Sequence, residues 1–97
     1  MQLIQTLDRT PMAHERLTVT SGLIVQPSVT NRIYKALFMT VEDNNLRYRI
    51  DGGDPTAVLG HLLIPYQNLY VIDEKSVRNL RLLATGADAN VVITYYN

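Results

Sequence analysis

The chain has 97 residues, which leaves room for one domain. Nine lysines and arginines balance nine aspartates and glutamates, so a strongly basic nucleic-acid-binding surface is excluded as a global property. The absence of cysteine excludes disulfides, thiolate nucleophiles and cysteine zinc sites, and the hydrophobic fraction of 46% is that of an ordinary globular domain.

We expect no targeting or membrane segment. The residues from Met1 to Gln5 lack the basic region and the long apolar region of a signal peptide. The apolar runs are short, as in Ala36-Leu37-Phe38-Met39, whereas a membrane-spanning helix needs about 20 apolar residues.

Residues 1–16 differ in pattern from the rest of the chain. Leu3, Ile4 and Leu7 are apolar, and Thr10-Pro11-Met12 then interrupts the pattern. We therefore expect an N-terminal arm or edge strand over residues 1–16, attached to a single domain over residues 17–97.

Alternation of apolar and polar residues, typical of half-buried strands, dominates the rest of the chain. In Leu46-Arg47-Tyr48-Arg49-Ile50, it puts both arginines on one face and the three other side chains on the opposite face. Residues 37–42 are more apolar and could be buried on both faces. The predicted strands are 16–20, 37–42, 46–50, 69–72, 80–84 and 91–96, and 23–25 is a short extended piece.

Turn residues separate these strands. Residues 43–45 (Asp-Asn-Asn) and 85–90 are each predicted to close a hairpin between the strands that flank them. The segment 51–55 ends the strand before it, because its glycines accept positive φ and its proline interrupts the ladder. One short helix is predicted over 73–78, with its first residue, Asp73, as N-cap.

Six or seven short strands at intervals of roughly 8–12 residues are typical of a β-sandwich or a small barrel. We predict an all-β fold, a small antiparallel β-sandwich of about seven strands with an N-terminal arm. The expected core is Leu17, Val19, Phe38, Val41, Leu46, Tyr48, Ile50, Leu62, Leu69, Val71, Leu80, Leu82, Val92 and Ile93.

Candidate binding residues lie on one strand face and at the C-terminus. Arg47 and Arg49 share a face, to which Arg81 could belong from a neighbouring strand. This face either binds phosphate or an acidic protein surface, or is an ordinary solvated face that deters edge-to-edge association. Tyr95 and Tyr96 alternate, so we expect one in the core and the other exposed at a protein interface.

No catalytic constellation is recognisable in the sequence. His61 has no adjacent nucleophile, and no G-x-S-x-G motif is present, so we interpret His61 as a hydrogen-bonded structural histidine. Asp43, Asp51 and Asp54 fit turn chemistry better than a calcium site, because their spacing does not match the EF-hand loop. We expect no enzymatic activity, metal or cofactor.

The stretch from Leu46 to Thr56, followed by Gly60-His61-Leu62-Leu63, resembles two groups of proteins. It is similar to the Y-x-x-D-G-x-x-P-T hairpin of immunoglobulin-like modules attached to chitobiase-type and other secreted carbohydrate enzymes. Over roughly residues 17–96, the chain more closely resembles small proteins encoded in the structural modules of tailed bacteriophages and prophages. The second likeness also draws on residues 17–21, 34–37 and 79–81 and on the final valine-rich strand.

The resemblance implies an immunoglobulin-like sandwich and a non-enzymatic virion protein, assembled in the host bacterial cytoplasm. The implied role is a capsid decoration protein bound to the major capsid protein, with an accessory head–tail, neck or tail protein as an alternative. A carbohydrate- or surface-binding module is a third interpretation, weakened because the chain has no tryptophan. Formation of a homo-oligomer is left as an open alternative, and no nucleic-acid or membrane partner is expected. The partner contacts are assigned to Leu3, Ile4, Leu7, Arg47, Arg49 and Tyr96.

Overall fold

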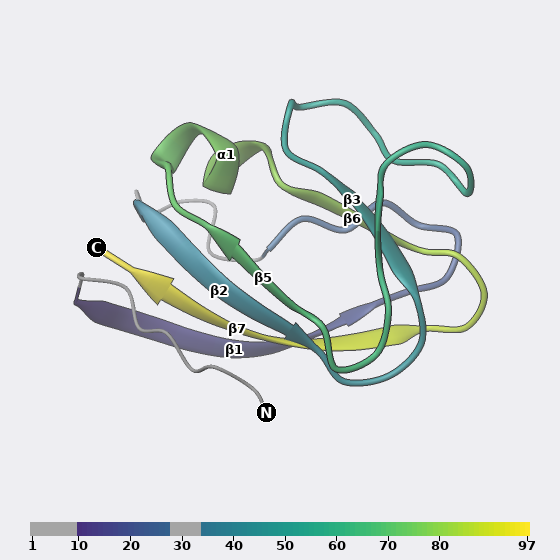
Figure 1. The fold of residues 1–97 in the computed structure, drawn as a ribbon, viewed down its shortest axis with the longest axis horizontal. Helices are drawn as coiled ribbons and strands as arrows, with labels where there is room; N and C mark the ends of the chain where they lie inside the picture. The colour runs from purple at the N-terminus through teal and green to yellow at the C-terminus, as the bar shows by residue number, and fades with distance from the viewer. Residues whose placement is uncertain (1–9, 28–33) are drawn as a thin grey trace.

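The protein folds into two antiparallel β-sheets with a shared hydrophobic core between them (Figure 1). The computed structural model describes residues 10–27 and 34–97, and the strand order there is β1-β7-β2-β5 in one sheet and β4-β3-β6 in the other. The strands are β1 (Pro11–Val19), β2 (Ala36–Val41), β3 (Leu46–Arg49), β4 (His61–Leu63), β5 (Asn68–Val71), β6 (Arg81–Ala84) and β7 (Ala89–Tyr96). The predicted all-β sandwich of about seven strands is confirmed.

Alternating side chains of both sheets fill the space between them. On the four-stranded sheet, Leu37 and Met39 of β2 lie beside Ile93 of β7, and all three are fully buried. On the three-stranded sheet, Leu46 of β3 and Leu82 of β6 are equally buried. The opposite face of the three-stranded sheet, its outer face, therefore carries the alternate residues of these strands.

A short helix, α1 (Glu74–Asn79), connects β5 to β6 and confirms the helix predicted over 73–78. Asp73 is its N-cap, and the Asp73 carboxylate accepts a hydrogen bond of 3.0 Å from the backbone N–H of Ser76. Val77 is the buried residue of the helix, and it joins the core cluster.

The two predicted hairpins are wrong. Residues 43–45 connect β2 to β3, and residues 85–88 connect β6 to β7, so each connection crosses from one sheet to the other. The first crossover is bonded to the second and to the start of β7. Asn44 donates to the carbonyl of Asp88 (2.9 Å), and Asp43 accepts from the backbone N–H of Asn90 in β7 (2.8 Å). Turn chemistry predicts a chain reversal, but it does not specify which sheet the next strand joins.

The predicted core is partly correct. The predicted residues that are buried are Val19, Val41, Leu46, Val71, Leu80, Leu82 and Ile93, and those that are half-buried and packed against the core are Leu17, Tyr48 and Leu69. The prediction is wrong for four residues. Phe38 and Val92 are half-buried, and Ile50 and Leu62 are exposed. Phe38 and Val92 lie on the outward face of runs that are apolar on both faces, and Phe38 stacks on Tyr70 there, with ring centroids 4.5 Å apart.

The other two errors have a different cause. Ile50 follows the last residue of β3, so it lies outside the ladder that buries Leu46. Leu62 lies in β4, a three-residue strand that was not predicted from the sequence, and the buried residue of that strand is Leu63. Three residues are too few for periodicity to indicate which side chains face the core.

The strand β1 lies at the edge of the four-stranded sheet and pairs with β7. Residues 11–16, within the predicted arm or edge strand, belong to it, whereas Leu3, Ile4 and Leu7 lie outside the described residues. After β1 the chain reaches the other sheet, where Val25 and Leu82 of β6 exchange two backbone hydrogen bonds of 2.9 Å. Residues 21–25 therefore cover the edge of β6.

The burial pattern of β4 predicts a sharp difference between two adjacent leucines. Replacing Leu63 by Ala leaves a cavity between the sheets and should lower the free energy of unfolding by about 2–4 kcal/mol. Replacing Leu62 by Ala removes an exposed side chain and should lower it by less than about 1 kcal/mol. Urea unfolding of the two variants beside the unsubstituted protein tests this, and equal losses would contradict the assigned orientation of β4.

Candidate functional site

Exposed apolar side chains are concentrated in one part of the described chain. Ten large hydrophobic residues are exposed there, and seven of them lie between positions 50 and 72. Single exposed hydrophobics are ordinary on protein surfaces, but a concentration of them marks a candidate interaction surface. The seven are Ile50, Val58, Leu59, Leu62, Ile64, Tyr66 and Ile72.

The most exposed of these residues, Val58, lies with Leu59 at the tip of the loop that connects β3 to β4, residues 50–60. The tip is a tight turn in which Thr56 donates from its backbone N–H to the carbonyl of Leu59 (2.8 Å). The Thr56 hydroxyl accepts from the backbone N–H of Leu59 (2.9 Å). This turn presents Val58, with 87% of its surface exposed, and Leu59, with 55% exposed.

Arg47, on the outer face of β3, holds this tip in place. Its Nε donates to the carbonyl of Ala57 (3.0 Å), and its Nη1 donates to the carbonyl of Gly60 (3.0 Å). Both carbonyls belong to the loop, one on each side of the exposed pair Val58 and Leu59. The guanidinium therefore bridges the base of the apolar tip.

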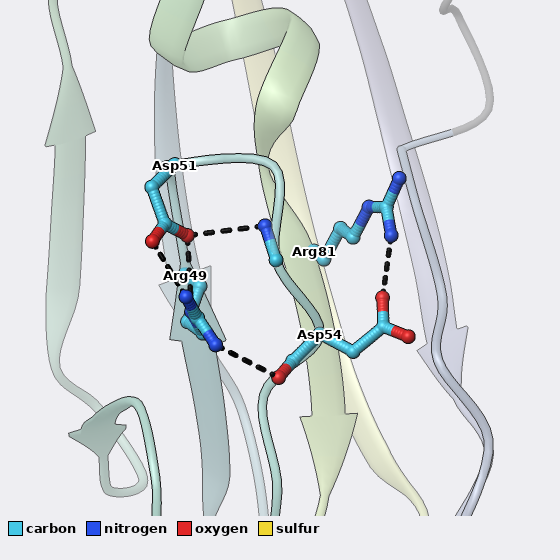
Figure 2. A network of polar contacts seen from close by, with 5 residues as sticks. Arg49, Asp51, Asp54 and Arg81 are labelled. Carbon is cyan, nitrogen blue, oxygen red and sulfur yellow. Dashed lines mark hydrogen bonds and ion pairs between the residues drawn. The ribbon is translucent and has the colours of Figure 1, made fainter.

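Arg49 and Arg81 hold the first half of the loop (Figure 2). They lie opposite each other in the β3–β6 ladder, a like-charged arrangement that destabilises a sheet unless it is compensated. Two aspartates of the loop compensate it: Asp51 accepts two hydrogen bonds from Arg49 (2.9 and 2.6 Å), and the Asp54 carboxylate pairs with Arg81. Arg49 also donates to the Asp54 carbonyl (3.3 Å), so the network connects both strands to the loop.

The charges of this network shift the titration of its members. The hydrogen bonds from Arg49, and then the one from the backbone N–H of Gly53 (3.1 Å), lower the pKa of Asp51 from 3.8 to about 2. The same pairing raises the pKa of Arg49. Both residues therefore stay charged throughout the physiological range, and the bond between them is not a pH switch there.

Two glycines let the loop approach the sheet. A Cβ at Gly53 would lie 2.5 Å from the guanidinium carbon of Arg49, closer than real atoms approach. Gly60 has a φ of +122°, and a Cβ there would lie 3.1 Å from the carbonyl oxygen of Tyr48. The glycines of this stretch thus permit close contact with β3 as well as a change of direction.

The turn after β4 adds an exposed tyrosine with a strained backbone. Gln67 donates to the carbonyl of Ile64 (3.1 Å) across Pro65 and Tyr66, and Tyr66 has a φ of +70°. This is the pattern of a type II turn, whose third position favours glycine or asparagine. A tyrosine is nevertheless present and is 81% exposed. Because tyrosine is enriched at protein interfaces, Tyr66 in the turn after β4 is a further candidate contact residue.

A shallow groove borders the loop. Its volume is about 500 Å³, and its lining includes Ile50, Val58, Leu59 and His61. His61 is exposed, and its ring lies 5.2 Å from that of Tyr48. The predicted structural histidine is thus a surface residue of the groove.

The structure places the sequence-predicted site residues in different environments. Arg47 and Arg49 lie on one face as expected and are joined by Arg81, but the side chains of Arg47 and Arg49 donate their hydrogen bonds to the chain's own loop. The expectation that one of the two C-terminal tyrosines is exposed is wrong, since Tyr95 is buried and Tyr96 is 8% exposed. The cause is the position of β7, which lies between β1 and β2 rather than at an edge.

Tyr95 has a structural role. Its hydroxyl donates to the carboxylate of Glu15 in β1 (2.7 Å), and burial is the main cause that raises its pKa.

Val58 and Leu59 were not predicted from the sequence as site residues. The signal was present, because two adjacent apolar residues in a stretch rich in Gly, Pro and Asp are unusual for a turn.

Among residues 10–27 and 34–97 there is no group of three or more side chains suited to hold a metal ion. Asp43, Asp51 and Asp54, weighed above as turn residues or calcium ligands, accept hydrogen bonds from amides or arginines. No helix in this part of the chain is long and apolar enough to cross a membrane.

No family model, curated protein or solved structure shows significant similarity to the chain.

The hydrogen bonds of Arg49 predict that this residue orders the loop. In Arg49→Ala, Asp51 and the Asp54 carbonyl lose the guanidinium that donates to them, so amide hydrogen exchange and protease cleavage within residues 51–60 should become faster. Arg16→Ala is the matched control, because it removes an exposed ion pair with Glu42 (2.8 Å) on the other sheet. The control should leave loop exchange unchanged, and equal effects of the two substitutions would contradict this role.

The low pKa of Asp51 predicts a loss of stability in acid. The folded-state pKa is about 2 and the ordinary value is 3.8, so the folded protein binds fewer protons than the unfolded chain between these values. The contribution of Asp51 is therefore complete at pH values about one unit or more above 3.8, and it is lost as the pH falls toward 2. The difference in unfolding free energy between the unsubstituted protein and Asp51→Asn should shrink over this range. A constant difference would contradict the assignment.

Proposed function

We propose that this protein is a non-enzymatic structural protein of a tailed-bacteriophage virion, and that it is a capsid decoration protein that binds the major capsid protein. The sequence resemblance supplies the virion context. The single structural observation that supports the proposal is the apolar tip, Val58 and Leu59, which three arginines hold in place on the outer face of the three-stranded sheet. Both features favour a protein that acts through contacts with other proteins.

An ordered apolar tip suits this role for an energetic reason. Burying apolar surface on association is favourable by roughly 25 cal/mol per Å². A flexible loop loses much of that gain when it becomes ordered on binding, and a loop that is already ordered does not. The bonds from Arg47 to the carbonyls of Ala57 and Gly60 fix the tip in the free protein. The tip is thus prepared to enter an apolar depression on a partner.

We further propose that the sandwich is a variant of the immunoglobulin-like arrangement. In that arrangement the second strand pairs with the fifth and the third with the sixth, and both pairs occur here. The differences are the last strand, β7, which lies between β1 and β2, and β4, which pairs with β3. Because β7 lies between two strands of the four-stranded sheet, and does not pair with β6, the C-terminal tyrosines are in the interior.

The N-terminal segment is a second proposed contact with the particle. Leu3, Ile4 and Leu7 are the residues that carry this assignment, and they belong to the sequence before β1. Strand addition or the insertion of apolar side chains into a groove are the common modes for such segments. The contact is tested by removing residues 1–9, which leaves β1 complete because that strand begins at Pro11.

The decisive experiment is binding to purified particles that lack this protein. Val58→Asp places a charge at the apolar tip and should weaken binding about tenfold or more, as for a residue central to an interface. Leu23→Asp is the matched control, because Leu23 is exposed but lies outside the 50–72 surface. The control should bind like the unsubstituted protein.

Two results would contradict the proposal. Undiminished particle binding by Val58→Asp would remove the tip as the contact. Absence of the protein from purified virions, measured by quantitative mass spectrometry against the major capsid protein, would remove the virion function itself. A copy number matching a single ring would assign the protein to the neck or tail rather than to the capsid lattice.

A further inference from the structure

The loop between β3 and β4 contains a dipeptide with a chemistry of its own, Asp51-Gly52. It is the one Asp-Gly pair in the sequence, and Asn-Gly does not occur. In an Asp-Gly pair the glycine amide nitrogen can attack the carboxyl carbon of the aspartate, because glycine has no Cβ to hinder the approach. The side chain of Asp51 is therefore a candidate site of spontaneous modification.

The surroundings of this pair leave room for the reaction. The Asp51 side chain is 60% exposed, so water reaches it. Gly52 has a φ of +87°, and a Cβ there would meet nothing nearer than the side chain of Asn79, at 3.8 Å. Neither member of the pair belongs to a strand or to the helix. Packing therefore does not prevent a five-membered ring from forming at this position.

The group that opposes the reaction is the guanidinium of Arg49 (Figure 2). It donates to both carboxylate oxygens of Asp51 (2.9 and 2.6 Å), and the backbone N–H of Gly53 donates to one of them (3.1 Å). The attacked carboxyl group must be protonated and must lose one oxygen as water, so two anchored, ionised oxygens make it a poor electrophile. The neighbouring charges, Asp54 and Arg81, are paired with each other. Arg49 is thus the cation that holds Asp51.

The titration of Asp51 indicates the size of this protection. Its pKa is lowered from 3.8 to about 2, first of all by the hydrogen bonds from Arg49. At neutral pH the protonated fraction, which is the reactive one, is therefore roughly 60-fold smaller than in an unfolded chain with the ordinary pKa. The restraint on the positions of the two oxygens acts in addition to this factor.

We propose that Asp51-Gly52 is a site of isoaspartate formation whose rate is set by Arg49. The Gly52 nitrogen bonds to Cγ of Asp51, and its proton leaves with the carboxyl hydroxyl as one water molecule, which closes a succinimide ring. Water then adds to one of the two ring carbonyls. Addition at Cγ restores aspartate, whereas addition at the main-chain carbonyl carbon breaks its bond to the Gly52 nitrogen and leaves isoaspartate. The mass is unchanged overall, and nothing is oxidised or reduced.

The product would change the loop as well as residue 51. The main chain would then run through Cβ and Cγ of that residue, and the free carboxylate would lie on its former α-carbon. The carboxylate would leave the position in which Arg49 binds it. Because that pairing holds the first half of the loop, the conversion should loosen the segment that leads to the apolar tip. The inference goes beyond the proposed function, since it concerns a reaction of the free chain.

The test follows isoaspartate at residue 51 in the full chain during weeks in warm, neutral buffer. Protease digestion, chromatographic separation of the isomeric peptides and electron-transfer fragmentation measure it. The folded protein should convert at least about tenfold more slowly than the same protein unfolded in guanidinium chloride, because each pKa unit is a factor of ten in the protonated fraction. Folded Arg49→Ala should convert about tenfold faster than the folded unsubstituted protein.

Arg16→Ala is the matched control, because it removes the ion pair with Glu42 on the other sheet. It should convert at the rate of the unsubstituted protein. Amide hydrogen exchange within residues 51–60 should also be faster in the purified isoaspartate form than in the unconverted protein.

Three results would overturn the inference. The first is an equal rate in the folded and the unfolded unsubstituted chain, a comparison that needs no variant to fold. The second is an equal rate in folded Arg49→Ala and the unsubstituted protein. The third is the absence of isoaspartate from the unfolded chain, which would remove Asp51-Gly52 as a modification site. None of these measurements involves particles, so the capsid-binding proposal and this inference can fail independently.

Discussion

Three guanidinium groups on the outer face of the three-stranded sheet bind a loop of the same chain, and the character of the surface depends on this interaction. Arg47 bonds to loop carbonyls, Arg49 to Asp51 and Arg81 to Asp54. Without these bonds, two facing arginines in the β3–β6 ladder would repel each other. The loop thus stabilises the sheet, and the sheet orders the loop.

The arginines order a loop of their own chain. This structural role differs from both interpretations made from the sequence, which were partner binding and an ordinary solvated face. Arg47 and Arg49 do not form a merely solvated face, because their donors are directed to carbonyls of the loop. Exposed ion pairs contribute little individually, whereas a connected set with bidentate geometry orders a segment more effectively. The result is an uncharged, apolar tip above a polar base.

The alternation of arginines with apolar residues in β3 shows what a sequence pattern can predict about side-chain orientation. Its arginines alternate with apolar residues, so the buried face of Leu46 and the outward face of Arg47 and Arg49 were predictable. In β2 both faces are apolar, and the orientation of Phe38 was therefore not determined by pattern. Packing against β5 decides it, because Phe38 stacks on Tyr70 outside the core.

The remaining errors concern relations between distant segments. The composition of residues 43–45 predicts a turn, but the partner of the following strand depends on the whole sheet order. The hydrogen bonds of Arg47 were equally beyond prediction, since they require the folded position of carbonyls at Ala57 and Gly60. Local chemistry predicted every strand except β4, together with the helix and the turns, whereas the assignment of strands to sheets and the candidate site arise from tertiary packing.

The most direct test of this account is the backbone order of residues 51–60 in the free protein, measured by nuclear magnetic resonance relaxation. If the arginines order the loop before any partner binds, the amides of Val58 and Leu59 should have order parameters near 0.85, like those of the strands. Order parameters below about 0.6 at these two residues would show a flexible tip and would contradict the account.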